Sequence, residues 1–224
     1  MIRLTRLVTV GTAILTLLVS ATVAIAATAA PAPSTDHAHA AARTSRQAFA
    51  ADMRKLWEDH ITWTRLFIVS DATLPDPLPD LDATTQRLLE NQDDIGNAIA
   101  AFYGPAAGDQ LTELLKEHIL GAAALLNAAK AGEDTTAASE AWYANANEIA
   151  DFLHNANPRN WSQAEMRDMM KSHLDLTLEE AVARLQGRYD DDIAAYDKVH
   201  AEILQMADML ANGIIAQFPQ KFAN

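Results

Sequence analysis

Apolar residues recur at helical spacing along most of this chain, and five interruptions divide the pattern. From Gln47 onward an apolar side chain returns every three or four residues, which is the period of a helix with one buried face. Proline and glycine break this period, because proline removes a hydrogen-bond donor and glycine weakens a helix. The breaks lie at 73–80, 103–105, 131–134, 155–161 and 186–190. The pattern therefore predicts six helices, at 46–71, 81–102, 106–131, 135–154, 162–186 and 189–217.

Composition agrees with an all-helical domain. Half of the 224 residues are hydrophobic, alanine is frequent, and there are only eight glycines and eight prolines. Runs of β-branched residues, which favour strands, are scarce beyond the N-terminus. Residues 46–224 are enough for one domain with a single core. We therefore expect an all-α domain over this range, a six-helix bundle built from three consecutive helical hairpins.

The N-terminus has the pattern of a secretory signal peptide. Arg3 and Arg6 precede a long apolar run, and Ala24-Ile25-Ala26 is a small-residue cleavage site. We therefore predict a signal peptide over 1–26, a flexible Ala/Pro-rich tether over 27–45, and export to an extracellular, periplasmic or cell-surface location. The alternative is an uncleaved membrane anchor, since the apolar run nearly matches a bilayer in length.

Charge and motif content exclude several classes of function. The net charge is −13, with no cluster of Lys or Arg in the body of the chain, so nucleic acid is not expected as a partner. There is no cysteine, which excludes disulfides, thiolate metal sites and a cysteine nucleophile. The sequence has no phosphate-binding loop and no nucleophile elbow. These observations favour a protein that is not an enzyme, with an unknown protein or small ligand as partner.

A histidine interrupts the apolar stripe of every odd-numbered predicted helix. His60, His118 and His173 are separated by 58 and 55 residues, in the stretches "LWEDHITWT", "LLKEHILGA" and "MMKSHLDLT". Each is followed four positions later by a small residue, Thr or Ala, on the same helical face. Because stripe residues face the core, we expect all three imidazoles inside the bundle.

The even-numbered predicted helices share a second pattern. In each, an amide is followed three residues later by an acid, and a proline comes 10 or 11 residues after the acid. The shared amide and acid pair, its place after a histidine helix and the proline that ends each helix favour triplication of one helical hairpin. The amide and acid pairs are Asn91 and Asp94, Asn145 and Glu148, and Gln205 and Asp208.

Counting residues from the hairpin turns indicates which polar groups lie level with the histidines. At about 1.5 Å per residue, His60 is level with Asp94 and His118 is level with Glu148. The third hairpin departs from this scheme, because His200 matches the level of His173 better than Asp208 does.

Two interpretations of the three histidines remain open. In the first, His60, His118 and His173 form a buried polar network with acids or amides of the neighbouring helices. In the second, they bind a divalent transition metal such as Zn, Fe or Cu, although the Glu-x-x-His motif of di-iron bundles is absent. The arrangement of the hairpins separates the two. Hairpins closed around one axis bring the histidines together, whereas side-by-side stacking keeps neighbours about 10 Å or more apart.

The quoted stretches also carry a resemblance. The chain resembles a group of small, uncharacterised bacterial helical proteins of the exported or envelope type, over most of residues 50–222. That group has no established activity, so the resemblance implies only the domain boundaries and the absence of a known enzyme family. The expected function is therefore a non-enzymatic binding or structural protein of the cell envelope, with a metal-binding bundle as the alternative. The stretches are "LWEDHITWTR", "LLKEHI", "NEIADFL", "MMKSHLDLT" and "ILQMADMLANGIIAQFP".

Overall fold

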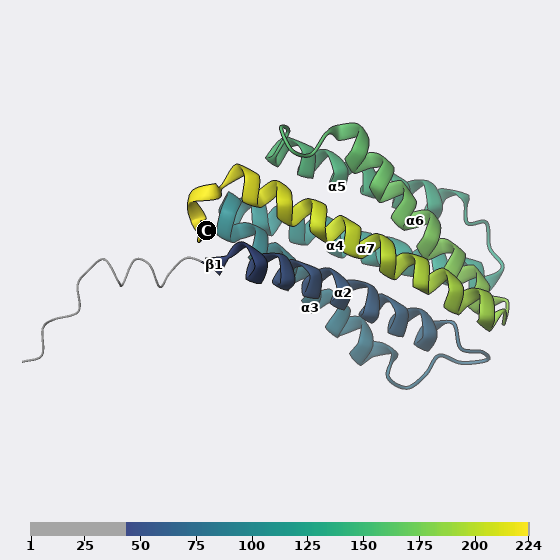
Figure 1. The fold of residues 1–224 in the computed structure, drawn as a ribbon. Helices are drawn as coiled ribbons and strands as arrows, with labels where there is room; N and C mark the ends of the chain where they lie inside the picture. The colour runs from purple at the N-terminus through teal and green to yellow at the C-terminus, as the bar shows by residue number, and fades with distance from the viewer. Residues whose placement is uncertain (1–43, 224) are drawn as a thin grey trace, which may run out of the picture.

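The computed structural model describes residues 44–223, and this part of the chain is almost entirely helical. Six long helices follow one another (Figure 1), as the apolar period predicts, and their ends lie within two residues of the expected positions. The helices are α2 (Arg46–Asp71), α3 (Leu81–Tyr103), α4 (Pro105–Ala131), α5 (Thr136–Ala156), α6 (Gln163–Leu185) and α7 (Tyr189–Gln217). The predicted signal peptide over 1–26 and most of the tether lie outside the described residues.

Local signals account for several helix ends. Ser162 accepts a hydrogen bond from the backbone N–H of Glu165 and donates one to its carboxylate, so the two residues cap the start of α6. Gly132 ends α4 with a φ of 69°, a left-handed conformation that glycine adopts without strain. Asp80 precedes α3, but its side chain does not cap the helix and its carboxylate accepts from the hydroxyl of Ser70 at 2.8 Å.

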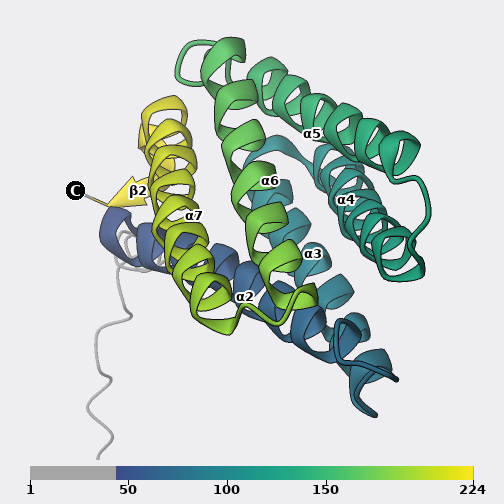
Figure 2. The same cartoon turned by 90° about the vertical axis from the view of Figure 1, so that its right-hand side faces the viewer.

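The six helices form a closed bundle. Each helix packs against the next one in the chain, and α7 packs along α2, which closes the ring (Figures 1 and 2). The α3 and α4 backbones approach each other closely at two glycines. A Cβ on Gly96 would lie 2.8 Å from the carbonyl oxygen of Gly108, and one on Gly108 would lie 2.6 Å from that of Gly96. Because α7 packs along α2, the three consecutive helix pairs form a closed ring and are not stacked side by side.

The chain closes on itself at one end of the bundle. Residues Thr44–Ser45 (β1) pair in parallel with Phe222–Ala223 (β2), which follow a short 3-10 turn, Pro219–Lys221 (η1). Ser45 also caps α2, since its hydroxyl accepts from the backbone N–H of Ala48 at 3.0 Å. Thr44 and Ser45, at the end of the predicted tether, thus contact the helical domain that starts at Arg46.

One large apolar core fills the bundle, and a smaller cluster adjoins it near the C-terminal end of α2. Trp161 is fully buried, and its indole occupies the space that the missing side chain of Gly213 leaves on α7. Within residues 44–223, no helix is both long enough and apolar enough to cross a membrane. The large core leaves room for few polar side chains, and the three histidines are among them.

Candidate histidine centre in the bundle core

Three histidines from alternate helices meet inside the bundle. His60 on α2, His118 on α4 and His173 on α6 are only 3%, 3% and 5% exposed. The ring centroid of His173 lies 5.9 Å from that of His60 and 6.2 Å from that of His118. We call these three residues the histidine centre. Their burial confirms the prediction from their stripe positions, and their proximity follows from the closed ring.

Each imidazole is held at Nδ1 by a side-chain oxygen from the next helix in the chain. The Nδ1 atom of His60 lies 3.2 Å from Oε1 of Gln92, and that of His118 lies 3.1 Å from Oδ1 of Asn145. The third follows the same rule, with Nδ1 of His173 3.1 Å from Oε2 of Glu202. The three partners come from α3, α5 and α7, so every hairpin supplies one histidine and its own partner.

The amide contacts determine the tautomers of His60 and His118. The amide nitrogen of Gln92 donates to the carbonyl oxygen of Leu88 at 2.7 Å, and that of Asn145 donates to Leu114 at 3.1 Å. Both amides therefore turn their oxygen toward the histidine, which must donate from Nδ1. In the neutral rings of His60 and His118 the proton therefore resides on Nδ1, and Nε2 carries a lone pair.

Burial keeps at least two of the imidazoles neutral. Burial, together with charge repulsion from the neighbouring His173 and His118, lowers the pKa of His60 from 6.5 to about 3. The pKa of His118 is lowered to about 3 by burial and by His173. Neutral imidazoles are the form that binds metal ions and accepts hydrogen bonds.

Two of the three rings have tryptophan neighbours. Trp142 stacks against His118, with centroids 5.4 Å apart, and Trp57 meets His60 edge-on at 5.7 Å. Among residues 44–223, the side-chain hydrogen bonds of these three histidines are made at Nδ1. The indole N–H of Trp57 is buried and has no partner among these residues. In the same part of the chain, no group of three or more His, Asp or Glu side chains is close enough to hold a metal ion as it stands.

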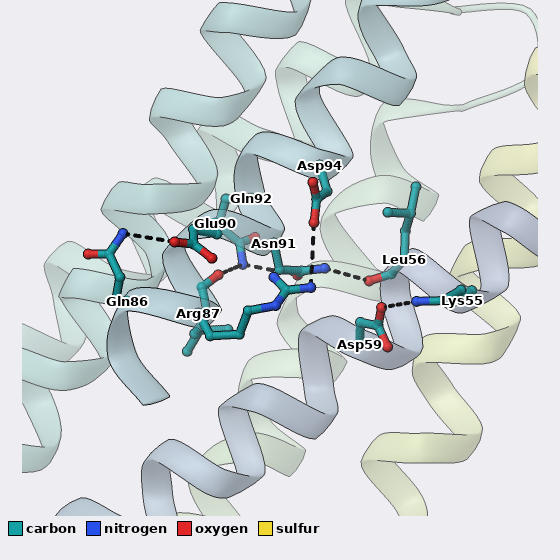
Figure 3. Close-up of polar contacts among 10 residues, drawn as sticks. Lys55, Leu56, Asp59, Gln86, Arg87, Glu90, Asn91, Gln92 and Asp94 are labelled. Atoms are coloured by element: carbon teal, nitrogen blue, oxygen red, sulfur yellow. Dashed lines mark hydrogen bonds and ion pairs between the residues drawn. The ribbon is translucent and has the colours of Figure 1, made fainter. Parts of the chain in front are cut away.

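Two hairpins repeat the same backbone contact. The amide nitrogen of Asn91 donates to the carbonyl oxygen of Leu56 at 3.1 Å, as Figure 3 shows, and Asn145 donates to Leu114 at the same distance. Leu56 and Leu114 each lie four residues before a histidine of the centre. A single residue, Asn145, makes both contacts in the second hairpin, whereas Asn91 and Gln92 divide them in the first.

The structure does not bring the expected acids to the histidines. Asp94 is exposed and pairs with Arg87 at 3.6 Å (Figure 3), while Glu148 is exposed and borders an open groove. Asp208 pairs with Arg54, and His200 with Glu58 at 2.8 Å. These partner assignments are wrong because residue counting gives the level along a helix but not the face, which turns about 100° per residue.

A second buried cluster was not anticipated from the sequence. Arg65 on α2 donates to Glu180 on α6 at 2.9 Å and to both carboxylate oxygens of Asp192 on α7. The side chains of Glu180 and Asp192 are 2% and 0% exposed. Burial raises the pKa of Glu180 to about 7 despite the adjacent guanidinium. This cluster joins the first hairpin to the third, next to the histidine centre.

The fold and the site thus define a closed six-helix bundle with three buried imidazoles at its core. No protein family, curated protein sequence or solved structure matches this chain. The functional argument therefore depends on the chemistry of the described residues.

Proposed function

We propose that this chain is an exported, non-enzymatic binding protein of the cell envelope that takes a divalent transition-metal ion at His60, His118 and His173. One observation carries the proposal, namely that each Nδ1 donates to a side-chain oxygen of the neighbouring helix. Metal-binding histidines are usually held in this way, because the contact orients the ring and leaves Nε2 free for the ion.

The donor set suits zinc or copper(II). Three neutral imidazoles with an open fourth position are a common ligand set for Zn²⁺, with Zn–N bonds of about 2.0–2.1 Å. Rings bound to one ion at that distance would have centroids about 5 Å apart. The centroids lie 5.9 and 6.2 Å apart along the two sides that involve His173. Along these two sides, binding therefore requires the rings to close by about 1 Å.

The competing interpretation is a purely structural network. In that case the Nδ1 contacts serve only to satisfy buried imidazoles, and added metal would not change the stability. The approach of His173 to His60 and His118, at centroid distances of 5.9 and 6.2 Å, favours the metal proposal, because satisfying each Nδ1 does not require the three rings to meet.

We also propose that the bundle arose from three copies of one helical hairpin. The contacts of Asn91 and Asn145 with the fourth residue before each histidine support it. Thr64 and Thr177, four residues after His60 and His173, both donate to the carbonyl oxygen of their histidine at 2.8 Å. The third hairpin departs at Gln205, which is exposed, while Glu202 takes the role of the amide.

Export remains part of the proposal, supported by the basic start, apolar run and Ala24-Ile25-Ala26 site of the N-terminus. N-terminal sequencing of the protein from the producing cells tests it. A chain that begins near residue 27 agrees with cleavage, whereas a membrane-bound chain that still begins at Met1 would show that the segment is an anchor.

The metal proposal is tested by the melting temperature of the full exported chain after treatment with a chelator. Zn²⁺ or Cu²⁺ is added back to the wild type and to His60→Gln, His118→Gln and His173→Gln. Because a ligand that binds only the folded state stabilises it, a hundredfold excess of metal over Kd should add about 2.7 kcal/mol to the wild type. The three variants should gain much less, since each lacks one ligand.

A matched control comes from the surface. His200→Gln removes a histidine that is paired with Glu58 outside the core, so the stabilisation by metal should persist in this variant. Loss of the metal effect in His200→Gln, or its absence from the wild type, would leave the structural network as the better account.

A further inference from the structure

A cavity of about 230 Å³ lies between α2, α4, α5 and α6. Phe67 and Ile68 of α2, Leu125 and Leu126 of α4, and Leu178 of α6 form much of its wall. Ala129, near the end of α4, is exposed, and Thr135 before α5 is half-buried, so solvent reaches the cavity from this side. We call this space the end cavity.

The lining of the end cavity is apolar and uncharged. None of the described residues that line it is acidic, basic or a histidine. Two of its threonines, Thr64 and Thr177, donate their hydroxyls to the backbone of their own helices at 2.8 Å, which leaves their methyl groups for the cavity. Polar atoms free for a ligand are confined to Thr135 and Ser139, on the side that solvent reaches.

The inner wall of the end cavity adjoins the histidine centre. Thr64, Ala122 and Thr177 each line the cavity and each lie four residues, about one helical turn, after one of the three histidines. Trp142 belongs to both sites, since it lines the cavity and stacks against His118. A molecule in the cavity would therefore contact side chains that touch the centre.

We infer that the end cavity binds a small uncharged molecule with an apolar body and one neutral polar group. Apolar cavities of 150 Å³ in other proteins hold benzene, so by volume this one suits about nine carbon atoms. A carboxylate or ammonium group would lose its hydration without gaining a partner, because no charge lines the wall. A neutral hydroxyl or carbonyl group can bond to Thr135 or Ser139. The space is too narrow for a helix, whose diameter is about 10 Å.

Titration calorimetry of the full exported chain with 1-octanol tests the inference. A chelator is present throughout, so the result does not depend on a metal at the histidine centre. We expect one saturable site with a negative change in heat capacity, the sign of buried apolar surface. Octanoate has the same chain length with a charged group, and it should bind at least tenfold more weakly.

Filling the cavity provides the second part of the test. Ala122→Leu places three more carbon atoms at the inner wall, where they take the space of about two methylene groups of the ligand. The Kd for 1-octanol should therefore rise about tenfold or more. Ala124→Leu adds the same side chain at an exposed position of α4 and should leave the Kd unchanged.

Ala181→Leu fills the cavity from α6 and keeps the test decisive if Ala122→Leu does not fold. The inference is overturned if 1-octanol gives no saturable binding, if octanoate binds as tightly, or if a folded filled variant binds as well as the wild type. None of these outcomes bears on metal binding at the histidine centre.

Discussion

Asn145 holds His118 and the helix that carries it with the two ends of a single amide. Its oxygen lies 3.1 Å from Nδ1 of the imidazole, and its nitrogen donates to the carbonyl oxygen of Leu114, one turn earlier on α4, also at 3.1 Å. The backbone contact prevents the amide from rotating, so the oxygen stays on the ring. The orientation and the tautomer of His118 therefore depend on α5 as well as on its own helix.

We predict that Asn145→Ala lowers the free energy of unfolding by about 2 kcal/mol, because the buried Nδ1–H of His118 loses its acceptor. Urea denaturation in the presence of a chelator measures the change. Asn147 is exposed on the same helix, so Asn147→Ala is the matched control and should change the stability by less than about 0.5 kcal/mol. Equal effects of the two substitutions would show that the amide does not support the imidazole.

The second prediction concerns acid stability. The pKa of His118 is lowered from 6.5 to about 3 in the folded state, so below pH 6.5 the unfolded chain binds a proton that the folded chain cannot. The free energy of unfolding should therefore fall as the pH drops from about 6.5 toward 3, by about 1.4 kcal/mol per pH unit for this histidine.

The measurement compares the wild type with His118→Gln between pH 4 and 6. Glu180, whose pKa is raised to about 7 by burial, acts in the opposite direction and stabilises the folded state more at low pH. Since Glu180 is present in both proteins, its effect cancels in the difference. The pH slope of the variant should be smaller by about 1.4 kcal/mol per unit, and identical slopes would contradict a neutral His118 in the core.

The third prediction separates the two carboxylates bound to Arg65. Asp192 is fully buried and accepts from the guanidinium with both oxygens, so Asp192→Asn should cost about 3–5 kcal/mol at pH 6. Glu180→Gln should cost about 1 kcal/mol or less, because burial raises the pKa of Glu180 to about 7 and the carboxyl is already mostly neutral at this pH. Thermal unfolding of both variants checks the difference, and a larger loss for Glu180→Gln would contradict this account.

The helices and the position of the histidines were accessible from the sequence because both depend on short-range signals. The apolar period places His60, His118 and His173 on the buried faces, and residues such as Gly132 and Ser162 act within one helical turn of the ends that they determine. Closure of the ring was not accessible, since the packing of α7 against α2 joins the two ends of the domain.

The partners of the histidines were harder to predict, for reasons that differ between hairpins. Gln92 does not belong to the repeated amide and acid motif, so that motif predicted its neighbour Asn91 as the polar residue of the first hairpin.

The role of Asp192 was not evident from the sequence either. It belongs to a run of three aspartates at the start of α7, where acids are expected to favour the helix dipole. Its actual partner, Arg65, is 127 residues away in the sequence.

Anomalous diffraction from crystals of the chain without its predicted signal peptide, grown with Zn²⁺, tests the central claim most directly. The account predicts one strong peak inside the bundle, about 2.0–2.1 Å from Nε2 of His60, His118 and His173, with each Nδ1 still on its oxygen partner. Crystals grown with a chelator should lack this peak. A core without zinc, or zinc bound only at surface groups such as His200 and Glu58, would contradict the account.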